Sequence, residues 1–226
     1  MTDTRPPFRQ IRASYTEDTI RVYQAYPTAI AAPAVEAGTF VPPFKMARMT
    51  WIKPSLTWML YRSGYGQKPG QECILGIDIK REGFEWALRH ATLAHRNVSD
   101  KGCVRVQWDP ERTVDIEKLD HRSIQIGLSG EAVERYVKEW IVGIEDITAL
   151  AHTLYTQGHG NRDTSLLPQE KEYPVPEDIR SILEMGKDYP TREELDRRQS
   201  CRAQQEAKRQ ERAKRRQERR QQTVVE

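Results

Sequence analysis

The chain has 226 residues, of which 37% are hydrophobic and 31% charged, and its formal net charge is +3. That length allows one domain or two small ones. The segment 197–220 holds eleven Arg or Lys residues and three Glu, so it carries about +8 and the rest of the chain about −5. The basic character therefore belongs to a C-terminal tail, and the net charge is no argument for nucleic-acid binding by the body.

The chain shows no sequence signal for export or membrane insertion. Its first ten residues, MTDTRPPFRQ, lack the apolar segment of a secretory signal, and no apolar run approaches the roughly 18 residues that span a bilayer. The three cysteines, Cys73, Cys103 and Cys201, form no CxxC pair, which indicates free thiols. We expect a soluble protein without a membrane partner, cytoplasmic or, in a eukaryote, nuclear.

Cap and turn residues divide the body into short elements. The polar run at 16–18 can cap a helix, Gly38 and Gly64 can end helices, and Pro54 suits a first helical turn. The apolar run CILGIDI at 73–79 is typical of a central strand buried on both faces. In chain order we expect a strand at 9–13, helices at 17–26 and 28–37, a strand at 46–53, a helix at 55–61, a strand at 73–79, a helix at 82–94, strands at 104–108 and 123–128, and helices at 131–142, 144–155 and 177–185.

The order of these elements favours an α+β fold. Strands and helices alternate irregularly, so residues 1–190 are predicted to form a single mixed domain with a central sheet flanked by helices. The motifs GxGxxG and GxxxxGK[ST] do not occur in the sequence, which leaves the usual dinucleotide-binding and P-loop folds without support.

Residues 191–226 are predicted to form a basic, Arg/Gln-rich tail that is helical or disordered. Thr191 and Glu194 have the spacing of a capping box. Between Leu195 and Val224 no Leu, Ile, Val or Met occurs, so the tail lacks the apolar seam of a coiled coil. Its charge, without aromatic residues, predicts weak nucleic-acid binding without sequence preference. The alternative is a helix that only adds solubility.

The strands expected at 104–108 and 123–128 alternate regularly between apolar and polar residues. If they pair, one face of the sheet is apolar, and the other carries amide, guanidinium and hydroxyl groups. This polar face is either an ordinary solvent-facing surface or the floor of a ligand site. Its Gln, Ser and Gly residues would leave room for a ligand.

A second group of polar residues lies in the segment RMTWIKPSLTWMLYRSG at 48–64, where two tryptophans and a tyrosine stand among three cations. Such aromatic rings could stack on a flat ligand while the cations hold a phosphate. The helix expected to begin near Ser55 adds N–H groups and the positive end of its dipole. The alternative is a buried core whose basic groups reach out to solvent.

We expect both groups to line one pocket for a small anionic or nucleotide-like ligand, because cations gathered in an acidic body indicate an anionic partner. Arg suits phosphate or carboxylate, and Gln can recognise an amide or a base edge. The five histidines lack the spacing of a metal site, so no metal is predicted, and no catalytic residue can be assigned. For Arg12 a structural ion pair is the alternative. The candidate ligand-binding residues are Arg12, Lys53, Arg62, Arg105, Gln107, Arg122 and Gln125.

Four runs of the chain, VYQAY, RMTWIKPSLTWMLYRSGYG, VQWDPER and RSIQIGL, point to a known family. They resemble the family called domain of unknown function 4291, over roughly residues 9–155 and, as an extension, the run LLPQEKEYPVP at 166–176. The long segment rich in Trp, Lys and Arg is the specific part of this resemblance. The resemblance implies a widespread domain of this size and no settled reaction, and the basic tail lies outside it.

Two classes of function compete. The order of Arg12, Ser123 and the Glu-x-Glu pattern at 170–172 resembles the arginine-first branch of the ADP-ribosyltransferases, which would make NAD the cofactor. Two features depart from that branch: Ser123 is not in a Ser-Thr-Ser run, and the Glu pair lies among prolines. The alternative is a non-catalytic, RNA-associated binding module that uses the basic tail, or a scaffold whose polar face meets only water. Whether the protein is an enzyme stays open.

Overall fold

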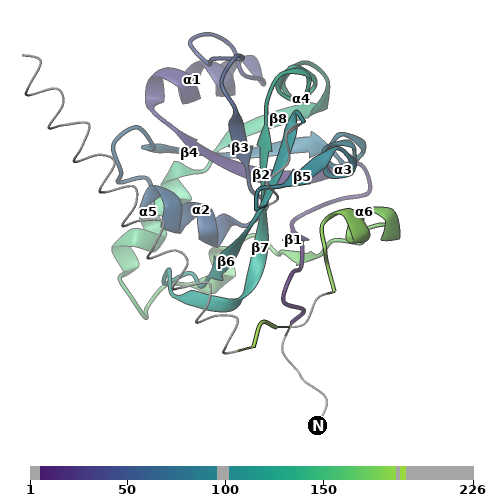
Figure 1. Cartoon of the computed structure of the whole chain (residues 1–226). Coiled ribbons are helices and arrows are strands. Elements are labelled where there is room, and N and C mark those ends of the chain that lie inside the picture. The colour runs from purple at the N-terminus through teal and green to yellow at the C-terminus, as the bar shows by residue number, and fades with distance from the viewer. Residues whose placement is uncertain (1–5, 96–101, 187–188, 192–226) are drawn as a thin grey trace, which may run out of the picture. The chain divides into compact units, whose positions relative to one another are not determined.

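Helices and strands both contribute substantially to the body of the chain (Figure 1), in a computed structural model that describes residues 6–95, 102–186 and 189–191. This confirms the predicted α+β class. The tail, with its predicted helix and nucleic-acid contacts, lies almost wholly outside the described residues. The strands are β1 (Arg12–Ala13), β2 (Thr19–Tyr26), β3 (Thr50–Ile52), β4 (Cys73–Lys80), β5 (Ala91–Leu93), β6 (Val104–Arg112), β7 (Lys118–Leu128), β8 (Ile141–Asp146) and β9 (Lys171–Glu172).

The helices are short. The helices expected at 28–37 and 55–61 are present, and η1 is a π-helical turn that continues α4. The helical elements are α1 (Thr28–Ala37), α2 (Leu56–Ser63), α3 (Arg81–Arg89), α4 (Glu131–Arg135), η1 (Tyr136–Trp140), α5 (Thr148–Gln157), the 3₁₀ turn η2 (Thr164–Leu166) and α6 (Glu177–Ile182).

The strands are distributed over three sheets. The strand β4 lies at the centre of an antiparallel sheet with the order β2-β4-β8, the central position that its apolar run predicted. A second sheet has the order β3-β7-β6-β5, with β5 parallel to β6, and β1 pairs with β9. The two larger sheets meet where the main chains of Tyr23 and Lys53 exchange N–H···O bonds of 2.7 and 3.3 Å.

The long strands β6 and β7 pair in a register that puts their apolar residues on one face and their polar residues on the other, as the alternation of apolar and polar residues predicted. Gln107 lies opposite Gln125, which places the polar residues of both strands on one face. The apolar residues of the other face are buried or packed against the core, namely Val104, Val106, Trp108, Ile124, Ile126 and Leu128.

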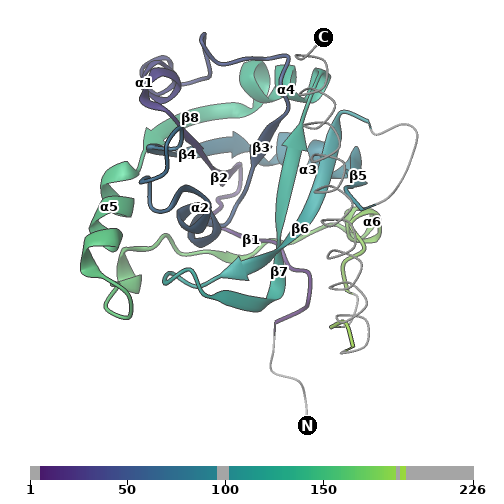
Figure 2. The same ribbon diagram turned by 60° about the vertical axis from the view of Figure 1, so that its left-hand side comes forward.

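Helix α2 ends at Gly64 as predicted, but Pro54 lies before the cap residue Ser55 and not in the first helical turn. The Ser55 hydroxyl accepts the N–H of Trp58 at 3.2 Å, and Gly64 adopts a left-handed conformation with φ 59°. In Figure 2 the helix lies between the three-stranded sheet and the β6–β7 hairpin, and it contacts both β2 and β6. The polar chemistry described below gathers on the two sides of this helix.

The prediction of a helix at 17–26 was wrong, because residues 19–26 form β2. Ile20, Val22, Tyr23 and Gln24 are buried along this strand. The β-branched residues Ile20 and Val22 favour strand over helix. All eight residues pair with β4, whose strand begins more than forty residues later in the chain. The N-cap pattern at 16–18 was a local signal that this long-range pairing overrode.

Two more boundaries differ from prediction for the same reason. Residues 141–146, expected as the end of one helix and the start of the next, form β8 at the edge of the β4 sheet. The helix expected to end at residue 94 ends at Arg89, and β5 follows it beside β6. The residues of these two edge strands are largely half-buried or exposed. Their sequences therefore lack the alternation of apolar and polar residues that marks a strand with one buried face.

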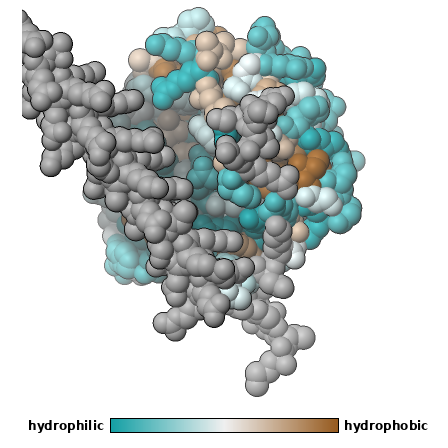
Figure 3. Space-filling view, viewed as in Figure 1, coloured by the Kyte–Doolittle hydropathy of each residue, from teal (hydrophilic) through white to brown (hydrophobic). Residues whose placement is uncertain are grey.

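The apolar faces of the two larger sheets pack into one core with α3, α4 and η1, where residues such as Ile77, Ile126 and Tyr136 are fully buried. Hydrophilic residues cover most of the face of the body that Figure 3 shows. Within residues 6–95 and 102–186, no helix has the length and apolar character needed to cross a membrane.

Candidate functional site

A cavity of about 510 Å³ lies between the end of β2, the loop that leads to β3, and one side of α2. The charged residues that line this large cavity are Lys45, Arg48 and Arg62, and none of the described Asp or Glu residues lines it. Among the residues that the structure describes, these three side chains form no ion pair with a carboxylate. The large cavity is therefore electropositive within a body of net negative charge.

Aromatic and amide groups complete the wall of the large cavity. Trp51, Tyr26 and Phe44 line it together with Gln125. The Trp51 ring lies over Gly127, where an added Cβ would be 2.9 Å from Trp51 Cη2. A side chain at position 127 would collide with the indole, so the bare backbone of the hairpin helps to position an aromatic wall.

A buried hydrogen-bond network fixes one end of the large cavity. Gln24 Nε2 donates to Thr50 Oγ1 at 2.6 Å and to the Trp51 carbonyl at 3.0 Å. Gln24 Oε1 accepts from the Tyr136 hydroxyl at 2.8 Å. The sequence interpretation missed Gln24 because it placed this residue on a helix, where its direction toward Thr50 could not be seen.

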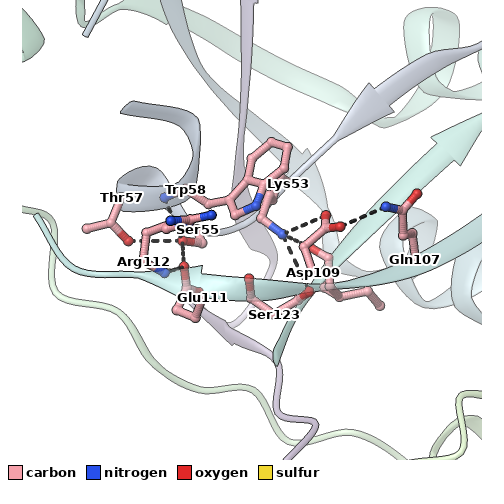
Figure 4. Close-up of polar contacts among 10 residues, drawn as sticks. Lys53, Ser55, Thr57, Trp58, Gln107, Asp109, Glu111, Arg112 and Ser123 are labelled. Carbon is pink, nitrogen blue, oxygen red and sulfur yellow. Dashed lines mark hydrogen bonds and ion pairs between the residues drawn. The ribbon is translucent and has the colours of Figure 1, made fainter. Parts of the chain in front are cut away.

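Lys53 lies behind Trp58 and has no exposed surface (Figure 4). Its Nζ is 3.5 Å from Asp109 Oδ2, donates to the carbonyls of Ser123 and Ile124 at 3.4 and 3.2 Å, and lies 4.3 Å from the centre of the Trp58 ring. Burial lowers the pKa of Lys53 to about 8, against the attraction of Asp109. Lys53 therefore joins β3 to the β6–β7 hairpin from within.

A second hollow of about 300 Å³ lies at the start of α2. Glu170 lines it, and its Oε1 accepts the N–H of Leu56 at 2.9 Å. Burial, with a smaller contribution from the charge of Glu111, raises the pKa of Glu170 to about 8. Arg12 Nη2 donates to the backbone carbonyl of Glu170 at 2.7 Å. The residues that line the second hollow are Pro6, Arg12, Thr57, Glu111, Arg112, Leu119, His121 and Glu170.

Glu111 ties the second hollow to the cap of α2. Its Oε1 accepts from the Ser55 hydroxyl and from the N–H of Arg112, both at 2.8 Å (Figure 4). These two hydrogen bonds hold the Glu111 carboxylate beside the first turn of the helix. Glu111 and Arg112 lie in the charged segment that the sequence interpretation placed between strands, although β6 extends through it.

The structure divides the predicted ligand residues among several places. Arg62 and Gln125 line the large cavity, and Arg12 lines the second hollow. Lys53 is fully buried and lines neither space. The other three predicted residues line neither space.

Those three residues make local contacts. Gln107 Nε2 donates to Asp109 Oδ1 at 2.7 Å, and Arg105 Nη2 lies 3.4 Å from the Ala94 carbonyl. The guanidinium of Arg122 lies 5.7 Å from the centre of the Phe8 ring. Their side chains therefore contact the hairpin and its neighbours.

The raised pKa of Glu170 predicts a loss of stability as the pH rises from about 4.5 to about 8. Between these pH values the folded state binds a proton on Glu170 that the unfolded state has released. The contribution of this proton to the free energy of unfolding is fully present below about pH 4.5, and it is lost as the pH rises to about 8. The variant Glu170→Gln keeps a neutral side chain of the same size and should have a flatter profile. Urea unfolding at several pH values below 8 measures this, and identical slopes for both proteins would contradict the assignment.

Comparison with known proteins identifies one family. The family model described as Domain of unknown function (DUF4291) matches residues 10–173, which include all seven predicted ligand-binding residues and the whole lining of the large cavity. No curated protein matches the chain.

Proposed function

Because the chain belongs to the DUF4291 family, whose description names no reaction, we propose a function from the geometry: the large cavity binds a small anionic, nucleotide-like ligand. The observation that carries this proposal is the charge of the lining, to which the described part of the chain contributes three cations and no carboxylate. Such a group of like charges favours an anion, because the cations repel one another without one.

The size and walls of the large cavity support a ligand that also has a flat ring. About 510 Å³ lies within the usual range of small-molecule sites. Trp51 offers an aromatic face, and the guanidinium groups of Arg48 and Arg62 can each bind two oxygens of a phosphate. Gln125 is the polar group best suited to a base edge, since an amide both donates and accepts.

Binding can be tested by thermal unfolding with AMP, ATP, NAD, adenosine and inorganic phosphate. A ligand at a hundred times its Kd adds about 2.7 kcal/mol, which raises the Tm of a domain of this size by several degrees. AMP or ATP should stabilise the protein more than adenosine does, because adenosine lacks the anionic group.

The variant Arg62→Ala should lose most of this stabilisation and keep the Tm of the free protein, because Arg62 is exposed and has no carboxylate partner among the described residues. Arg180→Ala, on α6, is the matched control and should respond to AMP as the wild type does. If no phosphate compound stabilises the protein, or if Arg62→Ala responds fully, the proposal is wrong.

Transfer of ADP-ribose from NAD is a finer proposal that rests on less. It is supported by the contact of Arg12 with Glu170, two members of the predicted order of residues. The third member, Ser123, is buried, and its carbonyl faces Lys53. Consumption of NAD by the purified protein, followed by release of nicotinamide, would support it.

The alternative function, nucleic-acid binding, rests on the charge of the tail alone. The full chain should bind short RNA weakly, and binding should collapse between low and moderate salt because each phosphate contact releases counterions. A protein ending at Pro190 should lose this binding. Equal affinity of the full and shortened chains, measured by fluorescence anisotropy, would show that the tail is not responsible.

A further inference from the structure

The second hollow lies across α2 from the large cavity. Trp58, Met59 and Arg62 line the large cavity, whereas Thr57 lines the second hollow. With 100° between successive residues of a helix, Thr57 points almost opposite to the mean direction of the other three. A small ligand in one space therefore does not occupy the other.

Arg112 is the residue of the second hollow that most needs a partner. Its Nη1 donates to the Ile116 carbonyl at 3.1 Å, and its guanidinium lies 3.8 Å from the centre of the Tyr61 ring. Its Nε is buried, and no group within the described residues accepts from it. The Nε–Nη2 edge of a guanidinium is a fork that matches the two oxygens of a carboxylate.

The charges around this fork select a monoanion. Arg12 and Arg112 contribute two positive charges, and Glu111 contributes one negative charge. Burial lowers the pKa of His121, so this ring is mostly neutral at pH 7. With its pKa near 8, Glu170 is mostly a neutral carboxylic acid at pH 7 and can donate a hydrogen bond. A net charge of about +1 suits one carboxylate better than a phosphate dianion, which would also face Glu111.

We propose that the second hollow is a separate ligand site for a small carboxylate that carries a hydroxyl or ammonium group. The Nε–Nη2 fork of Arg112 holds the carboxylate, with Arg12 beside it. Glu111 accepts from the hydroxyl or ammonium group through its second oxygen, to which no described residue donates. This site goes beyond the proposed function, since it takes a different ligand on the other side of α2.

Titration calorimetry with glycolate, serine, acetate and inorganic phosphate tests the site directly. Glycolate or serine should bind the wild-type protein, acetate more weakly because it lacks the donor group, and phosphate more weakly by about tenfold. The variant Arg112→Lys keeps the charge and loses the fork, so its affinity for glycolate or serine should fall about tenfold or more. Arg89→Lys, the same change at an exposed guanidinium of α3, should leave this affinity unchanged.

The variant Arg12→Gln provides a second test, because Arg12 is exposed and its loss should not prevent folding. It should also weaken binding. Arg62→Ala should lose most of the response to AMP and keep the response to glycolate or serine, which separates this site from the large cavity. Failure of glycolate and serine to bind at millimolar concentration, or equal binding by Arg112→Lys and the wild type, would overturn the proposal.

Discussion

Replacing Lys53 with Ala is expected to lower the free energy of unfolding by about 3–5 kcal/mol, the cost of removing one partner of a buried ion pair. Lys53 has no exposed surface, and Asp109 is only 8% exposed. Without the ammonium group, Gln107 Nε2 would be the one side-chain donor that the described residues leave to the Asp109 carboxylate. The two carbonyls of β7 that Lys53 Nζ contacts would also lose a donor.

Urea unfolding of three variants separates charge from packing at this position. Lys53→Met keeps the length of the side chain and leaves the Asp109 charge unpaired, so it should be nearly as harmful as Lys53→Ala. The double variant Lys53→Met/Asp109→Asn removes both charges and should recover much of the loss. A stable Lys53→Ala protein that fails to bind AMP would instead make Lys53 a ligand contact, as the sequence suggested.

The second large effect is expected at Gly83, in the first turn of α3. In an exposed helix, Gly→Ala stabilises by about 1 kcal/mol. Here an added Cβ would lie 2.3 Å from Trp140 Cγ and within 2.6 Å of Cδ1 and Cδ2, at the rigid base of a buried ring. We expect Gly83→Ala to destabilise the protein by about 1–3 kcal/mol, as overpacked cores do.

The control for Gly83 is Gly143→Ala on β8, where nothing lies within 4 Å of the added Cβ and the backbone needs no positive φ. It should change stability by no more than about 0.5 kcal/mol. The double variant Gly83→Ala/Trp140→Leu should relieve the clash. Its loss of stability should therefore be smaller than the sum of the losses of Gly83→Ala and Trp140→Leu measured singly. Chemical unfolding of the wild type, the two single variants, the double variant and the Gly143→Ala control measures these losses. A Gly83→Ala protein as stable as the wild type would refute the close approach of α3 to η1.

Local signals in the sequence were enough to determine several elements of this protein. The end of helix α2 follows from Gly64, since a left-handed glycine acts within one turn of the chain. The central position of β4 follows from its continuous apolar run. The two faces of the β6–β7 hairpin follow from alternation, because successive residues of a strand point to opposite faces.

Tertiary structure alone decided the form of β2 and the division of the candidate site. β2 is a strand because β4, far along the chain, pairs with all of it, and no local propensity reports a distant partner. Lys53 and Arg62 lie only nine residues apart in one basic, aromatic segment, yet one is fully buried against Asp109 and the other lines the large cavity. The cause is packing: α2 lies between two sheets, so its two sides, and the residues before it, meet different surroundings that the sequence does not display.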